Sequence, residues 1–163
     1  MKNIIYILSI LFITSCASSP QECETKANGF IDGVEGQVTM GEQSSVEVFN
    51  QIDKAWAELD YETLKTFVAE GAEMRFADGR VGVGPDEFIE IIKAWVSEVE
   101  DEDGNEYTWN TDYAFSLAVT SVEGDWVNAQ FTGSDGSVVI EWYQIEGDQL
   151  ISWVQTKGQV AKE

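Results

Sequence analysis

The chain has 163 residues, with 30 acidic and 9 basic side chains, a formal net charge of −21 and no histidine. Such an acidic surplus argues against nucleic-acid binding, which needs a basic patch, and against binding of anionic lipid through the protein surface. The lack of histidine excludes histidine acid–base chemistry and histidine metal ligands. The length suits one ordinary domain.

The first sixteen residues have the pattern of an export signal. Lys2 precedes an apolar run from Ile4 to Ile13, which is too short for a membrane-spanning helix of roughly 20 residues. The run ends in Ile13-Thr14-Ser15-Cys16, which resembles the lipobox of bacterial lipoproteins. That resemblance implies cleavage of a signal peptide (residues 1–15), lipid on Cys16, and a lipid-anchored place in the cell envelope of a bacterium, with the membrane and leaflet left open.

A flexible tether is expected from the lipidated Cys16 to residue 43, and one domain from 44 to 159. The tether is rich in glycine, serine and glutamate and has few apolar residues, although a short strand near Phe30-Ile31 or Val38–Met40 is compatible with it. If Cys16 carries lipid, Cys23 has no partner for a disulfide within the chain.

Two helices are expected at the start of the domain. Ser44 and Glu47 form a capping-box pattern, and apolar residues then recur at helical spacing to Leu59. Asp60 is positioned to cap a second helix, from Tyr61 to about Ala69, which Gly71 is expected to end.

A hairpin and a third helix should follow. Met74–Phe76 and Val81–Val83 read as paired short strands around an Asp78-Gly79 turn. Gly84-Pro85-Asp86 opens a helix whose apolar stripe runs from Phe88 to Val99.

The remainder predicts four antiparallel strands joined by glycine-containing turns. They span Tyr113 to Val119, Trp126 to Thr132, Val138 to Ile145 and Leu150 to Thr156. Because helices and strands are segregated along the chain, the fold class is α+β.

From residue 44 to 158, the chain resembles the nuclear transport factor 2-like superfamily, which includes SnoaL-like (polyketide-cyclase-like) domains and ketosteroid isomerases. The resemblance rests on the order of elements and three local patterns: Ala55-Trp56 through Phe67, Met74 through Gly79 leading to Gly84, and Glu146 through Trp153. It implies a cone in which three N-terminal helices pack on a curved, mainly antiparallel sheet.

The same resemblance gives no clear catalytic group. In ketosteroid isomerases a general-base aspartate lies on the strand after the second helix, and the matching position here is Phe76. Asp78 is close, but it falls in the expected turn and should face solvent. The cyclase branch also uses a histidine, which this chain lacks. The prediction therefore leans away from an enzyme.

Aromatic residues on the strands are the candidates for ligand binding. They are Trp126, Trp142, Tyr143, Trp153 and Tyr113. Trp142 and Tyr143 are adjacent, so only one of them can face an interior pocket. The alternative to ligand binding is that these aromatic residues pack in the core and form a dimer interface on the outer face of the sheet. Trp56 and Trp95 lie on helical stripes and are assigned to the core.

Asp112 and Glu141 are the candidate acid–base residues for an enzyme. Glu141 shares a strand face with Val139 and Tyr143, which allows an inward position where burial would raise its pKa. A solvated carboxylate at the sheet rim is the preferred interpretation.

An acidic segment after the third helix begins like a calcium-binding loop. Asp101, Asp103 and Asn105 have the spacing of oxygen ligands, but Glu106 stands where the loop motif requires glycine. A solvated helix end is therefore preferred, and no cofactor is expected, since the sequence has no phosphate-binding or metal-cysteine motif.

The sequence thus predicts a lipid-anchored envelope protein whose domain binds a small apolar ligand or a protein partner without catalysis. An isomerase- or cyclase-type enzyme using a pocket carboxylate and a structural dimerisation module are the alternatives, and a homodimer is compatible with each.

Overall fold

The computed structural model describes residues 29–33, 36–99 and 107–158. They form one seven-stranded sheet in the order β1-β4-β5-β6-β7-β2-β3, with three helices. The strands are β1 (Val38–Met40), β2 (Val68–Arg75), β3 (Val81–Val83), β4 (Trp109–Val119), β5 (Asp125–Gly133), β6 (Val138–Glu146) and β7 (Gln149–Gly158). The helices are α1 (Gln43–Ala57), α2 (Tyr61–Thr66) and α3 (Gly84–Val99).

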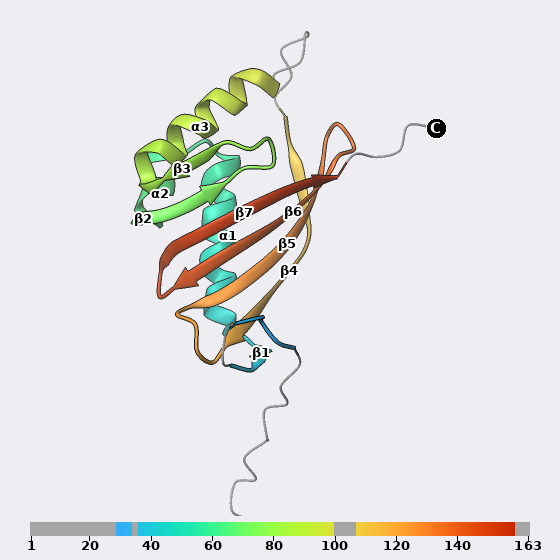
Figure 1. The fold of residues 1–163 in the computed structure, drawn as a ribbon. Helices are drawn as coiled ribbons and strands as arrows, with labels where there is room; N and C mark the ends of the chain where they lie inside the picture. Colours follow the sequence, from blue (N-terminus) through green and yellow to red (C-terminus); the bar gives the residue numbers. More distant parts are fainter. Residues whose placement is uncertain (1–28, 34–35, 100–106, 159–163) are drawn as a thin grey trace, which may run out of the picture.

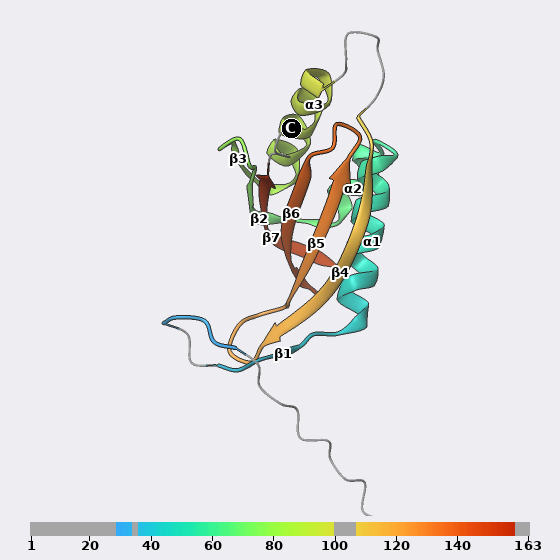
Figure 2. The ribbon, with the colours of Figure 1, turned by 90° about the vertical axis from the view of Figure 1, so that its right-hand side faces the viewer.

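The strand pairs are antiparallel except for β2 and β7, which are parallel. Figure 1 shows the twisted sheet running diagonally across the molecule, with α1 behind it and α3 beside β2 and β3. After a quarter turn, α1 lies along β4 (Figure 2). The expected α+β architecture, with three helices on a mainly antiparallel curved sheet, is confirmed.

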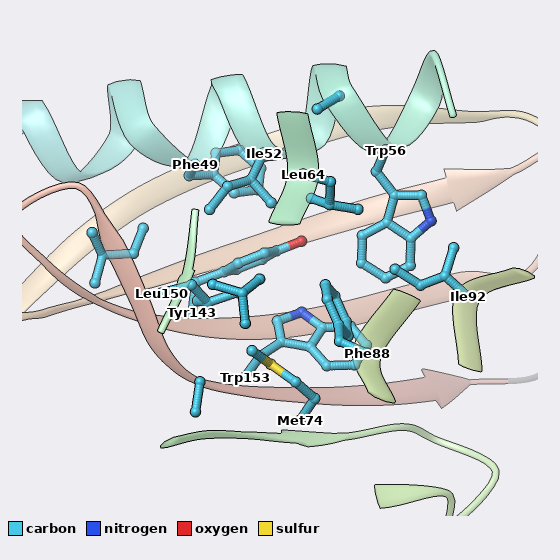
Figure 3. Close-up of a cluster of buried hydrophobic side chains, with 14 of the residues drawn as sticks. Phe49, Ile52, Trp56, Leu64, Met74, Phe88, Ile92, Tyr143, Leu150 and Trp153 are labelled. Carbon is cyan, nitrogen blue, oxygen red and sulfur yellow. The ribbon is translucent and has the colours of Figure 1, made fainter. Parts of the chain in front are cut away.

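The core lies between the helices and the inner face of the sheet. In Figure 3, Tyr143 and Trp153 project from β6 and β7 toward Phe49, Ile52 and Trp56 of α1. The rings of Phe49 and Tyr143 meet edge to face at 5.0 Å between centroids, a favoured aromatic geometry. Trp153 is fully buried, and this large apolar surface anchors the inner face of the sheet.

The start of α1 differs from the predicted capping box. The helix begins at Gln43 after Glu42, and Ser44 is not its cap. Instead Asp125 Oδ2, at the start of β5, accepts hydrogen bonds from Glu42 N at 2.6 Å and Ser45 Oγ at 2.8 Å. The capping-box prediction was wrong because the group that accepts these hydrogen bonds is a carboxylate from a segment distant in sequence.

The sheet also begins earlier than the predicted domain boundary. Val38 pairs with Val119 and Met40 with Leu117, so β1 is the edge strand next to β4. The strand that the sequence allowed at Val38–Met40 is present, and the domain includes these residues of the predicted tether. Residues 1–28, which contain the predicted signal peptide, Cys16 and Cys23, lie outside the described residues.

The second helix is shorter than predicted. Asp60 caps α2 as expected, accepting a 3.1 Å hydrogen bond from Thr63 N. The helix ends at Thr66, however, and Gly71 lies inside β2 rather than ending the helix. The helix ends early because the chain from Val68 onward forms a strand, in which Val68 pairs with Leu150 of the parallel strand β7.

The turn and the third helix follow the sequence prediction. Asp78-Gly79 lies between β2 and β3, and α3 starts at Gly84. Gly84 has φ of 76°, and an added Cβ would lie 2.7 Å from Glu70 O, so this junction favours glycine. Within the described ranges, no helix is long and apolar enough to cross a membrane.

Candidate functional site

A pocket of about 400 Å³ lies between the inner face of the sheet and the C-terminal halves of α1 and α3. Its lining residues on the strands lie toward the end of the sheet where β4 and β6 begin and β5 and β7 end. Figure 1 shows this end of the strands. Its lining residues are Asp53, Trp56, Phe76, Ala77, Asp78, Trp95, Tyr107, Trp109, Phe131, Val139, Glu141, Tyr143, Gln155 and Lys157. A volume of this size and a wall in which half of the residues are aromatic are typical of a small-molecule site.

Glu141 is the buried carboxylate of this pocket. Its side chain points to the inner face of β6, and the residue is 6% exposed. Trp153 Nε1 donates to Oε2 at 3.1 Å and Gln155 Nε2 donates to Oε1 at 2.8 Å, while the Tyr143 hydroxyl also donates to Oε2. The preferred sequence interpretation, a solvated carboxylate at the rim, was therefore wrong, since the alternation of β6 turns Glu141 inward together with Val139 and Tyr143.

Burial raises the pKa of Glu141 above its ordinary value, because a charged carboxylate loses its hydration there. The three donors oppose this change without reversing it, and the nearby negative charge of Asp53 adds to the rise. Burial also raises the pKa of Tyr143, whose hydroxyl therefore stays protonated and serves as a donor to Glu141.

Asp53 is the second inward carboxylate. It projects from α1, and its two oxygens each accept a 2.9 Å hydrogen bond, from Trp109 Nε1 and from Thr111 Oγ1 of β4. Sequence reasoning missed it. The available signal was its spacing, because Asp53 follows Phe49 by four residues and precedes Trp56 by three, which places it beside the buried stripe of the helix.

Gln155 holds the wall between the sheet and the β2–β3 turn. Its Nε2 donates to Glu141, and its Oε1 accepts a 3.3 Å hydrogen bond from Ala77 N. Both ends of the amide are therefore used. The sequence offered a clue in the alternation of Trp153, Gln155 and Lys157 on one face of β7, but amides of this kind are common on strands.

Charged groups at the pocket mouth are paired. Asp78 lies in the turn and binds Arg80, whose guanidinium Nε donates to Oδ2 at 2.7 Å; this bond lowers the pKa of Asp78. Lys157 is exposed, 3.4 Å from Asp135 Oδ2 and 5.8 Å from the centroid of the Tyr107 ring. The mouth of the pocket is thus close to neutral.

The predicted ligand-binding aromatics divide between two faces. Tyr143 lines the pocket and Trp153 lies behind it, where its N–H holds Glu141. Trp142, Trp126 and Tyr113 lie on the outer face of the sheet and do not line the pocket. Only one of Trp142 and Tyr143 faces inward, as strand geometry requires.

The helical tryptophans were assigned to the core. Trp56 is buried there as predicted, and both Trp56 and Trp95 also reach the pocket wall. Trp95 meets Tyr107 edge to face at 5.3 Å between centroids. The indole N–H of Trp56 is buried without an acceptor among the described residues. The helical stripe therefore serves the core and the pocket together.

The other acidic candidates lie elsewhere. Asp112 is exposed on the outer side of β4, where it accepts hydrogen bonds from Gln130 and Thr132, so it is not a pocket acid. Asp101, Asp103 and Asn105 fall outside the described residues. Within the described part of the chain, no cluster of acidic or cysteine side chains is arranged to hold a metal ion.

Solved structures share this fold. A SnoaL-like protein of unknown function from Burkholderia thailandensis matches with a TM-score of 0.57 at 12% identity, over 74% of this chain and 99% of that one. An NTF2-like protein of unknown function from Cytophaga hutchinsonii matches with a TM-score of 0.53 at 11% identity, over 72% and 93%.

A structure described as a "putative ketosteroid isomerase" from Kribbella flavida matches with a TM-score of 0.55 at 7% identity, over 76% of this chain and 84% of that one. No protein-family model matches the sequence, and no curated protein matches it. The chain therefore has the nuclear transport factor 2-like, SnoaL-like fold. At these identities the likeness concerns the fold and does not carry function.

Proposed function

We propose that this domain binds a small, largely apolar molecule in the aromatic pocket, and that lipid on Cys16 holds it at a bacterial cell envelope. The observation that carries the binding proposal is the pocket itself: it is about 400 Å³, walled by aromatic rings, and contains polar groups fixed by hydrogen bonds. Rigid walls favour binding because little side-chain freedom is lost when a ligand enters.

The binding proposal is tested by filling the pocket. Val139 lines it, whereas the adjacent Ile140 points to the other face of β6. In titration calorimetry of the full chain with 1-naphthol, indole and menthol, Val139→Phe should weaken binding by about tenfold or more, because the larger side chain occupies space that the ligand needs. Ile140→Phe is the matched control and should bind like the parent. Equal affinity in all three proteins, or no binding of any probe by the parent, would refute the proposal.

Acid–base catalysis is the second candidate function, and the buried Glu141 favours it. A carboxylate with a raised pKa beside an apolar cavity can accept a proton from a bound carbon acid. The test is exchange of α-hydrogens of enolisable ketones in deuterated water, followed by proton NMR. Exchange that is lost in Glu141→Gln supports an enzyme, whereas exchange at the same rate in both proteins excludes this residue as the base.

The proposed anchor predicts that the protein is lipidated at Cys16. A tether of about 20 residues would give the domain a reach of roughly 25 Å from the lipid surface, as expected for a flexible chain. Cys16→Ala should abolish acyl labelling and release the protein from the membrane fraction. Cys23→Ala should change neither, and membrane retention of Cys16→Ala would refute the anchor.

Self-association is a further proposal for the outer face of the sheet. Tyr113 and Phe115 are 40% and 38% exposed and stack at 5.8 Å, next to Trp142. Exposed aromatic patches of this kind often mark interaction surfaces. Light scattering should give the mass of two copies, and Phe115→Lys should return one. A single-copy mass for the parent protein would reject a homodimer.

A further inference from the structure

We propose that the preferred ligand is a protonated amine on an apolar body, its ammonium group held by the carboxylates of Asp53 and Glu141. This inference rests on the proposed binding function and names the chemical class of ligand. Three features of the pocket carry it: two acidic side chains without a salt bridge among the described residues, a surplus of hydrogen-bond acceptors, and aromatic walls.

The charges come first. Asp53 and Glu141 are held by neutral donors, and neither forms a salt bridge within the part of the chain that the structure describes. The other charged residues of the lining are already paired: Asp78 with Arg80, and Lys157 with Asp135. The interior therefore holds two acidic side chains without a cation, and an entering ammonium group would supply the countercharge that favours their ionised form.

Hydrogen-bonding capacity points in the same direction. The indole N–H groups of Trp109 and Trp153 are used on the two carboxylates, and both ends of the Gln155 amide are occupied. Glu141 Oε1 accepts one of these bonds, so it keeps acceptor capacity. A ligand that brings N–H donors fits this arrangement. A carbonyl or carboxylate would find the N–H groups of Trp109 and Trp153 engaged, and would have only a buried donor such as the indole N–H of Trp56 to bind.

Aromatic rings form much of the rest of the wall. Trp56, Trp95, Tyr107 and Trp109 line the cavity with Phe76. Their faces attract an ammonium group through the ring quadrupole and pack against an apolar body. The net charge of −21 adds a long-range field that raises the local concentration of cations.

The test compares three probes that share one ring: benzylamine, benzyl alcohol and benzoate. Calorimetry uses the full chain in a non-ionic detergent, with micelle-only titrations subtracted. Benzylamine should bind about tenfold tighter than benzyl alcohol, as expected for a hydrogen bond to a charged group, and benzoate should bind weakest.

Two variants locate the effect. Asp53→Asn and Glu141→Gln should each lower benzylamine affinity by about tenfold while leaving benzyl alcohol within about twofold. Asp148→Asn is the matched control, because it removes one charge from the exposed β6–β7 turn at the far end of the sheet, and it should change benzylamine affinity by less than about twofold. Asp53→Asn keeps an acceptor for Trp109, so it tests the inference even if Glu141→Gln does not fold.

Contrary results have distinct meanings. If the alcohol binds as tightly as the amine, or if Asp148→Asn weakens the amine as much as Asp53→Asn does, the inference is wrong. If neutral ring compounds bind but benzylamine does not, the amine preference fails while the proposed binding function stands. If every probe fails, both are overturned.

Discussion

The indole N–H of Trp153 donates a 3.1 Å hydrogen bond to Glu141 Oε2, joining the neighbouring strands β6 and β7 through a buried carboxylate. Tyr143 and Gln155 complete the set of donors. The carboxylate thus has hydrogen bonds without a countercharge, a state that is sensitive to pH.

The first prediction concerns the pH dependence of stability. Because burial raises the pKa of Glu141 above 4.5 in the folded chain, folding favours the protonated form. Its contribution is fully present below the unfolded pKa and is lost as pH rises through the folded pKa. The free energy of unfolding of the parent, minus that of Glu141→Gln, should therefore fall as pH rises above about 4.5.

Urea unfolding of both proteins over a pH series measures this difference. Carboxylates with lowered pKa values, such as Asp78, are common to both proteins and cancel in the subtraction. A difference that increases with pH would mean that the three donors outweigh burial, contrary to the prediction.

The second prediction concerns Gln155. Gln155→Met removes one donor from Glu141 and the acceptor of Ala77 N–H, so the pKa of Glu141 should rise further. Stability at neutral pH should fall by about 1–3 kcal/mol, the cost of buried polar groups left unpaired. Carbon-13 NMR titration and urea unfolding measure the two effects. Gln130→Met, which removes an amide from the outer face, is the control and should leave the pKa of Glu141 unchanged.

The third prediction compares two tryptophans of the pocket wall. Trp109→Phe removes the N–H donor of Asp53 Oδ1 and should cost about 1–3 kcal/mol of stability. Trp95→Phe replaces an indole of the same wall with a smaller ring and leaves both donors of Asp53, Trp109 and Thr111, in place. It therefore controls for lost packing. Equal losses in thermal unfolding of the two variants would show that the bond to Asp53 contributes nothing.

Much of the fold could be predicted from local patterns in the sequence. Periodicity placed α1, α3 and the last four strands, and Asp60 and the Asp78-Gly79 turn act as predicted. Alternation also required one of Trp142 and Tyr143 to face inward. These features depend on neighbours in the chain, which is why they can be read from one sequence.

The site could be predicted only in part. Glu141 was a candidate, but its burial depends on Trp153 and Gln155 from β7, which the sequence does not place beside it. Asp53 could have been predicted as a pocket residue only if the packing of β4 against α1, which brings Trp109 to it, had been known. Contacts between distant segments decide which carboxylates enter the pocket, and local patterns do not contain them.

The start of α1 gives the last prediction, because it separates local from distant capping. Ser44 has the capping-box pattern, yet Asp125 receives the hydrogen bonds of Glu42 N–H and Ser45 Oγ. Asp125→Ala should therefore cost about 1–2 kcal/mol of stability, the usual effect of losing a helix cap, whereas Ser44→Ala should be nearly neutral. Chemical denaturation measures both, and Asp148→Ala controls for the loss of one negative charge. A larger loss of stability in Ser44→Ala than in Asp125→Ala would instead support the capping-box prediction, because it would show that Ser44 caps the helix.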